Sequence, residues 1–249
     1  MSLAPPRSAW VGFPRPRPTA RLRLFCLPFA GGGASTFREW STYLPDDVEV
    51  CPILLPGRES RFREPAIGRI DLVVDELLKA LPGYMDRPFA LFGHSMGAMI
   101  GFELARRLRY LALEPVHFFA SGCRGPHLVN RTPPRYGLPD AEFIAALRNL
   151  NGVPSEVLGD DELMELMLPT IRGDFRLAET YVCRPQPPLR CPVTAVGGLE
   201  DVEVTREDLE AWSSHTTGQF QVHVLPGNHF FLSSSRTALL RLIRLGLKI

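Results

Sequence analysis

The sequence contains almost no lysine, few cysteines and no excess of either charge. Only Lys79 and Lys248 are lysines among 28 basic residues, and 27 acidic residues bring the net charge to +1. Because non-specific nucleic-acid binding depends on surplus positive charge, this balance argues against a nucleic-acid partner. The five cysteines are scattered and form no Cys-x-x-Cys pair, so we expect neither a disulfide framework nor a zinc site or other metal site.

No segment has the composition of a membrane span or a secretion signal. The longest stretch without charge, residues 211–235, is rich in Ser, Thr, Gln, Asn and His and is too polar to cross a bilayer. The first twenty residues hold prolines and arginines but no apolar segment, so we expect no secretory signal. These absences, with the unpaired cysteines, predict a cytoplasmic protein without a membrane partner.

The chain does contain a regular alternation of strand-like and helix-like segments. Its 249 residues suffice for one large α/β domain or two small ones. Short apolar runs predict six strands: Leu22–Pro28, Glu49–Leu54, Pro88–Phe92, Pro115–Ala120, Cys191–Gly197 and Phe220–Leu225. Helical periodicity predicts five helices between and after them: Thr36–Tyr43, Asp71–Leu81, Met96–Tyr110, Arg206–Ser214 and Ser234–Leu245. Several strands are continuously apolar, as strands buried on both faces are, so we predict an α/β fold with a mostly parallel sheet and helices on both faces.

Two segments depart from this alternation. About seventy residues separate the strand near 120 from the strand near 191, far more than one crossover needs, and they include helical pieces at Asp140–Leu150 and Asp160–Tyr181. We predict that residues of about 124–186 form a helical cap inserted into a single domain spanning 21–249. Residues 1–20 are predicted to form an irregular, solvated arm, because segment 1–23 has five arginines and no acid.

One short motif carries the strongest functional signal. Residues 93–97 read Gly-His-Ser-Met-Gly, a G-x-S-x-G pattern with an apolar strand before it and a helix after it. In that context the serine stands on a strained turn that exposes its hydroxyl at the carboxyl edge of the sheet. Ser95 is therefore the candidate nucleophile. Because a serine hydroxyl needs a base to take its proton, an acid and a histidine should follow it in the chain.

The candidate base and acid lie just past the last two predicted strands. His229 is the preferred base because it lies in the loop after the final strand, whereas His223, the alternative, lies in the middle of that strand. Asp201 and Glu200 both follow the penultimate strand and both qualify as the acid. Asp201 precedes His229 with one helix and one strand between them. The acid would orient the imidazole and stabilise its charged form.

A serine that attacks a carbonyl also needs backbone N–H groups to bind the oxyanion. One donor is expected from Met96, directly after the serine. The second is expected from the glycine-rich loop at residues 28–33, where we assign it to Ala30 and leave Phe29 and Gly31 open. This loop has no G-x-G-x-x-G or G-K-[ST] continuation, so the sequence does not favour a phosphate cradle there.

The combination of segments resembles a known family, the type II thioesterases. These free-standing α/β hydrolases accompany polyketide and nonribosomal peptide synthases, and they are similar to the free-standing thioesterase of animal fatty acid synthase. The resemblance covers roughly residues 20–245 and is carried by the following segments: Leu27–Gly32 (LPFAGG), 93–97 (GHSMG), Gly197–Asp201 (GGLED), Pro226–Phe231 (PGNHFF), Pro52–Arg58 (PILLPGR) and Leu168–Phe175 (LPTIRGDF) with Glu179 and Tyr181.

The resemblance implies an α/β-hydrolase fold and hydrolysis of acyl thioesters on the phosphopantetheine arm of acyl or peptidyl carrier protein domains. The usual task is editing, that is, removing stalled or wrong acyl groups from the synthase. No cofactor is implied, because the phosphopantetheine belongs to the substrate. Family roles carry over to these positions: Ser95 as nucleophile, His229 as base, Asp201 as acid, and the Ala30 and Met96 N–H groups as oxyanion donors. The sequence departs from the family at Val202, where proline is common, and at Leu199, where an acid is common.

Several interpretations stay open at this stage. The same triad could belong to a carboxylesterase or lipase acting on oxygen esters, or to an acyltransferase, and a non-catalytic binding module is the least favoured reading. Arg58, Arg172 and Arg176 could meet an acidic carrier protein or its phosphate, although ordinary surface arginines are favoured. Five apolar cap residues either line an acyl pocket or, as we prefer, pack in the core: Phe143, Leu147, Met164, Met167 and Leu168.

Overall fold

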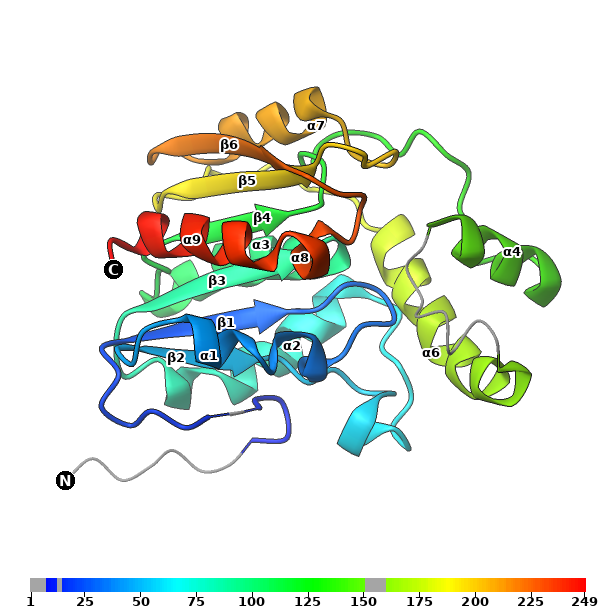
Figure 1. Cartoon of the computed structure of the whole chain (residues 1–249), viewed down its shortest axis with the longest axis horizontal. Helices are drawn as coiled ribbons and strands as arrows, with labels where there is room; N and C mark the ends of the chain where they lie inside the picture. The colour runs from blue at the N-terminus through cyan, green and yellow to red at the C-terminus, as the bar shows by residue number, and fades with distance from the viewer. Residues whose placement is uncertain (1–7, 13–14, 151–159) are drawn as a thin grey trace.

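A parallel sheet of six strands forms the centre of the molecule (Figure 1). The computed structural model describes residues 8–12, 15–150 and 160–249. The strands lie in the order β2-β1-β3-β4-β5-β6, and every neighbouring pair is parallel. Their bounds are β1 Leu22–Leu27, β2 Val48–Pro52, β3 Phe89–His94, β4 Phe118–Ser121, β5 Val193–Gly198 and β6 Phe220–Leu225. The six predicted strands and the parallel α/β architecture are thereby confirmed.

Helices cover both faces of this sheet and bury it in two apolar layers (Figure 1). One layer packs α2 (Ile70–Ala80), α3 (Met96–Leu108) and α7 (Arg206–Glu210) against the sheet. The other layer packs the short α1 (Trp40–Tyr43) and α8 (Phe231–Ser234) with α9 (Arg236–Leu247). Every residue of β3, β4 and β5 is buried, which explains why these strands read as continuous apolar runs.

Two predicted helices are interrupted where the sequence suggested one continuous segment, and a third begins later than predicted. The segment predicted over Thr36–Tyr43 is a 3-10 turn (Ala34–Phe37) followed by α1, and the one over Arg206–Ser214 tightens into a 3-10 turn (Ala211–His215) after α7. The last predicted helix, Ser234–Leu245, corresponds to α9 alone, and the short α8 before it was not predicted. Ser235 separates the two helices, and its hydroxyl donates to the Pro226 carbonyl at 2.7 Å. Serine readily bonds to nearby backbone in this way, and helical periodicity does not reveal the competition.

The cap consists of α4 (Asp140–Leu150) and α6 (Asp161–Glu179), which lie beyond the carboxyl ends of the strands (Figure 1). Asp160 caps α6 by accepting the Leu163 N–H at 3.0 Å. The two helices bury a small apolar cluster of their own, made of Phe143, Leu147, Met164, Leu168 and Ile171. Residues 151–159 of the predicted cap lie outside the described part of the chain.

Part of the N-terminal arm is docked on the body of the protein. The prediction that the arm is solvated is wrong for Trp10, Val11, Arg17 and Ala20, whereas Arg15 and four other described residues of the arm are exposed. Trp10 and Val11 are buried, and the Arg17 side chain is only 8% exposed. The Arg17 guanidinium donates to the carbonyls of four residues around α1 and β2: Ser41, Leu44, Pro45 and Val48. A charge run was expected to face water, but here buried backbone carbonyls provide the partners that make burying one arginine tolerable. Residues 1–7 and 13–14 of the arm lie outside the described part.

Among the described residues, no helix combines the length and apolarity that crossing a bilayer would require.

Candidate active site

Ser95 stands on a sharp turn between β3 and α3. Its backbone has φ 53° and ψ −117°, a conformation that costs a non-glycine residue on the order of 1–3 kcal/mol. The surrounding backbone holds it there, since the Ser95 N–H donates to the Ser121 carbonyl of β4 at 2.7 Å. Glycine is required at position 97, where a Cβ would lie 2.2 Å from the Leu27 carbonyl oxygen at the end of β1. The close approach at Gly97 brings the end of β1 directly against the elbow.

Asp201 and His229 meet at the same edge of the sheet. Asp201 follows β5 and His229 follows β6, and these neighbouring parallel strands end side by side. The His229 Nδ1 lies 2.8 Å from the Asp201 Oδ2, and the Asp201 side chain is fully buried. The other carboxylate oxygen of Asp201 accepts the N–H groups of Glu203 at 2.9 Å and Val204 at 3.2 Å. These bonds fix the carboxylate, and the carboxylate in turn fixes the orientation of the imidazole.

The structure distinguishes the candidates that the sequence left open. Glu200 is exposed, and it is the carboxylate of Asp201 that meets the imidazole. His223 stays in mid-strand, 3.4 Å from the Gln221 side chain. His117 is buried against Thr194, and burial lowers its pKa to about 4. Neither of these two histidines lines the cavity that contains Ser95.

His94 lies inside the elbow but points into the protein. Its Nδ1 is 2.8 Å from the Ser121 hydroxyl, and its ring centroid is 5.3 Å from that of His229. The ring also packs against three phenylalanines: Phe29, Phe230 and Phe231. Complete burial, with a smaller contribution from the nearby His229, lowers the pKa of His94 well below its usual value. A neutral His94 therefore supports the loop that carries His229.

The loop after β1 makes a tight turn at Phe29–Gly32. The Gly32 N–H donates to the Phe29 carbonyl at 2.9 Å, and Gly31 has φ +77°, as the third position of a type II turn requires. The Gly31 N–H donates to Asp174 at 2.7 Å, so it is directed at the cap and not at Ser95. Phe29 and Ala30 line the cavity beside Ser95. Met96 is in the first turn of α3, where an N–H has no acceptor within the helix.

A cavity of about 350 Å³ opens between the sheet edge and the cap, and Ser95 and His229 both line it. Its apolar walls come from α3, from the loop after β4 and from the cap: Met99, Cys123, Leu147, Leu150, Phe175 and Ala178. Of the five apolar cap residues singled out in the sequence, only Leu147 lines this cavity; Phe143, Met164 and Leu168 pack within the cap cluster, and Met167 lies against it. The preference for core packing thus agrees with four of the five positions.

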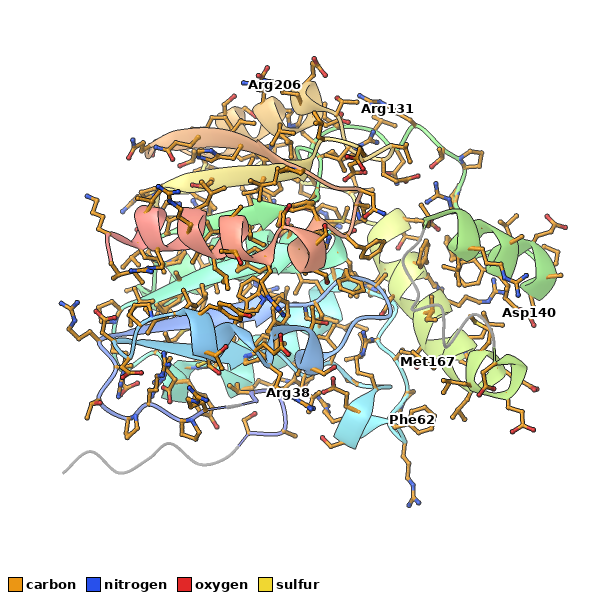
Figure 2. All side chains as sticks on the ribbon, viewed as in Figure 1. Arg38, Phe62, Arg131, Asp140, Met167 and Arg206 are labelled. Atoms are coloured by element: carbon orange, nitrogen blue, oxygen red, sulfur yellow. The ribbon has the colours of Figure 1, made fainter. Side chains whose placement is uncertain are left out.

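Three arginines also line the cavity, and sequence analysis missed them. Arg131 forks onto the buried Asp208 of α7 at 2.7 and 3.0 Å, and Figure 2 shows it on the loop between β4 and α4. Arg124 lies 3.8 Å from the same carboxylate, and Arg135 bonds Glu203 at 3.0 Å. These bonds join the loop before the cap to the segment after β5. No motif marks these arginines, because each pairs with a residue at least 68 positions away.

Two of the three arginines considered as contacts for a carrier protein, Arg58 and Arg172, have partners within the chain, whereas Arg176 of α6 is exposed. Arg58 is 6% exposed and pairs with Asp174 of α6, so it cannot serve as a surface contact. Arg172 lies over the Phe143 ring at 4.4 Å and donates to the Tyr136 and Leu138 carbonyls. Among the described residues, no group of three or more His, Cys, Asp or Glu side chains is placed to hold a metal ion.

Comparisons with known proteins agree with this geometry. A thioesterase domain family matches residues 22–245. Linear gramicidin dehydrogenase LgrE of Brevibacillus parabrevis is 44% identical over 240 residues, which cover 95% of this chain and 91% of the relative. Gramicidin S biosynthesis protein GrsT of Aneurinibacillus migulanus is 45% identical over 218 residues, covering 87% and 85%. The solved structure of the type II thioesterase BorB from the borrelidin biosynthetic cluster aligns with a TM-score of 0.89 at 39% identity, covering 96% of this chain and 98% of that one. The chain therefore belongs to the thioesterase family, and it resembles the type II members in sequence and structure.

Proposed function

We propose that this enzyme hydrolyses acyl thioesters carried on the phosphopantetheine arm of acyl or peptidyl carrier protein domains, as an editing enzyme of a polyketide or nonribosomal peptide synthase. The observation that supports this most strongly is the buried bond from Asp201 to His229, beside a strained Ser95 in one cavity of a thioesterase-family fold. The reaction we propose uses only protein groups and water, without a metal ion or cofactor.

The proposed reaction has two halves that share one base. Ser95 attacks the thioester carbonyl while the His229 Nε2 takes its proton, and the oxyanion accepts the N–H groups of Ala30 and Met96. The carbon–sulfur bond then breaks, and the imidazolium returns the proton to the pantetheine thiolate. Water enters, His229 removes a proton from it, and the resulting tetrahedral intermediate releases the free acid and regenerates Ser95. Asp201 keeps the Nδ1 proton on the ring throughout and stabilises the imidazolium.

The names of similar proteins support the choice of substrate. One relative is named for gramicidin S biosynthesis, and the type II thioesterase BorB comes from a borrelidin biosynthetic cluster. Synthases of this kind hold their intermediates as thioesters in the cytoplasm, which is where we place the enzyme. Another relative is named a dehydrogenase. We propose no hydride transfer here, because the loop after β1 lacks the G-x-G-x-x-G pattern and the acidic residue that a dinucleotide site uses.

The decisive experiment compares thioester and oxygen-ester hydrolysis by the wild-type enzyme and Ser95→Ala. We expect the wild type to release free acid from an acyl-carrier protein and from an acyl-pantetheine thioester much faster than from a nitrophenyl ester of the same acid. Ser95→Ala should lose at least about 10³-fold in rate, because the nucleophile is gone. Normal turnover by Ser95→Ala would refute the mechanism. Preference for the oxygen ester would favour a carboxylesterase, and transfer to an added alcohol or amine in place of water would favour an acyltransferase.

A further inference from the structure

A buried ion pair connects the cap to the loop that is to bind the oxyanion. Asp174 lies in the middle of α6 and is 2% exposed, and Arg58, in the loop after β2, is 6% exposed. The Arg58 guanidinium and the Asp174 carboxylate form a bidentate ion pair with N–O distances of 2.7 and 2.8 Å, although the two residues are 116 positions apart in the sequence. Pairs buried this completely are costly unless their remaining hydrogen-bonding capacity is used, so the additional partners of the pair are informative.

Both members of the pair use that remaining capacity on the same turn. The Asp174 Oδ2 accepts the Gly31 N–H at 2.7 Å, and one Arg58 terminal nitrogen donates to the Gly32 carbonyl at 2.8 Å. The Arg58 Nε donates to the Pro56 carbonyl at 3.2 Å, which anchors the guanidinium to its own loop. The turn at Phe29–Gly32 is therefore held by a carboxylate from the cap and a guanidinium from the body of the protein.

This arrangement excludes Gly31 from the candidate oxyanion donors and favours Ala30. The Gly31 N–H is already bonded to Asp174, so it is not available to bind an oxyanion. Ala30 occupies the second position of the turn, whose N–H takes no part in the turn's own hydrogen bond. Because the two residues after Ala30 are both fixed, the direction of the Ala30 N–H is fixed with them.

We propose that Asp174 and Arg58 are positioning residues, which hold the Ala30 N–H in the place where the oxyanion forms. The inference rests on the proposed function, since it concerns the same hydrolysis. Neither side chain lines the cavity, so neither is placed to touch the substrate. Their removal should lower the rate of bond formation at Ser95 and leave substrate binding nearly unchanged. Because Asp174 lies on α6, this positioning role would also make the rate of catalysis depend on the position of α6.

The test is a double-mutant cycle between Ala30→Pro and Asp174→Asn. Proline is favoured at the second position of a type II turn and has no N–H, so Ala30→Pro removes the donor and keeps the turn. The readouts are kcat and KM for an acyl-pantetheine thioester and the rate at which a fluorophosphonate labels Ser95. We expect Ala30→Pro to lose about 10²–10³-fold in kcat and in labelling rate, as loss of one oxyanion donor does. Asp174→Asn should lose about 10-fold with KM within about twofold of wild type, because the asparagine keeps one acceptor but loses the charged pair.

The decisive quantity is the effect of Asp174→Asn in the Ala30→Pro background compared with its effect in the wild type. If Asp174 acts through the Ala30 N–H, then Asp174→Asn should cost less than about twofold when Ala30→Pro is already present. A purely structural role would cost the same tenfold in both backgrounds and would overturn the proposal. Arg58→Met with Asp174→Leu removes both charges together, which avoids leaving one buried charge unpaired. This pair of changes should fold and should label at least tenfold more slowly than wild type; wild-type labelling would also overturn the proposal.

Thr170→Val is the matched control. Thr170 lies one turn before Asp174 on α6, and its hydroxyl donates to the Gly57 carbonyl at 2.9 Å, so it ties the same helix to the loop after β2 without contacting the turn at Phe29–Gly32. We expect its labelling rate to stay within about twofold of wild type. A slowing equal to that of Asp174→Asn would mean that general anchoring of the cap explains the effect. If the wild type labels at Ser95 but hydrolyses no thioester, the proposed function fails while the labelling rates still decide this inference.

Discussion

Replacing Asp201 by asparagine should invert one hydrogen bond and remove the base function of His229. The Asp201 Oδ1 accepts two backbone N–H groups, from Glu203 and Val204, and the Oδ2 faces His229. An asparagine must keep its carbonyl oxygen toward the two N–H donors, so its amide group must face the imidazole. An amide donates, so the His229 Nδ1 has to accept and the ring proton moves to Nε2. In that tautomer the His229 Nε2, which is to take the Ser95 proton in the proposed reaction, already carries a proton and cannot take another.

The expected loss in kcat is about 10⁴-fold, the size of the effect when a triad aspartate forces the wrong tautomer. At 1.36 kcal/mol per tenfold change, this corresponds to about 5 kcal/mol of transition-state stabilisation. The free energy of unfolding should change by only about 1 kcal/mol, because the number of hydrogen bonds around the buried group is preserved. A single-turnover assay with an acyl-pantetheine thioester at pH 8 measures the first quantity, and urea denaturation measures the second.

Glu200→Gln is the matched control, because it makes the same chemical change at the neighbouring, exposed carboxylate. We expect its kcat to stay within about twofold of wild type. The reasoning is refuted if Asp201→Asn keeps more than a tenth of wild-type activity. It is equally refuted if Glu200→Gln loses as much as Asp201→Asn, since that would make Glu200 the acid.

Two further outcomes follow from the cavity and from the buried histidines. Ala178 lines the cavity from α6, so Ala178→Leu should reduce kcat/KM for long acyl chains about tenfold more than for short ones. Phe143 packs in the cap cluster, so Phe143→Leu should keep the chain-length profile of the wild type. The same profile for both variants would contradict this assignment. Burial lowers the pKa of His117 to about 4. Between pH 6.5 and pH 4 His117 is therefore protonated in the unfolded chain but neutral in the folded chain, so the free energy of unfolding falls as the pH falls. His117→Gln does not titrate, and by pH 4 it should have lost less unfolding free energy than wild type by on the order of 3 kcal/mol; equal acid dependence in urea denaturation would contradict this.

Local sequence patterns were sufficient to predict the sheet. In β3, β4 and β5, burial on both faces leaves short, nearly continuous apolar runs, and the remaining strands are short β-branched or apolar segments between the helical ones. The same holds for the elbow, where the strand before Ser95 and the helix after it are each visible in the sequence. His229 could be assigned because it lies in the loop just past the end of the last strand, whereas the alternative, His223, lies within that strand. The choice of Asp201 over Glu200 could not be made in this way, because adjacent residues in one loop differ only in which one the turn after β5 directs inward.

The features that sequence analysis missed all depend on distant pairs. Arg58 and Asp174 are 116 positions apart, and nothing around either residue shows that the other will cover it. Arg17 belongs to an arm that the sequence predicts to be solvated, since a charge run without acids normally faces water. The carbonyls around α1 and β2, together with Asp46 at 3.1 Å, make the burial of its guanidinium tolerable. For the apolar cap residues, the sequence could not separate those that line the cavity from those that pack within the cap, because both groups have the same composition and spacing.

The way the elbow is held has a consequence for the folding of the chain. Ser95 reaches its strained conformation only where β4 offers the Ser121 carbonyl and the end of β1 presses against Gly97. No two of these strands form a hairpin, so each pairing closes a long loop of chain and is expected to form slowly. A reactive serine therefore exists only after three segments far apart in the sequence have assembled. The rate at which Ser95 becomes reactive toward a fluorophosphonate during refolding would thus report the completion of the central sheet, independently of any substrate.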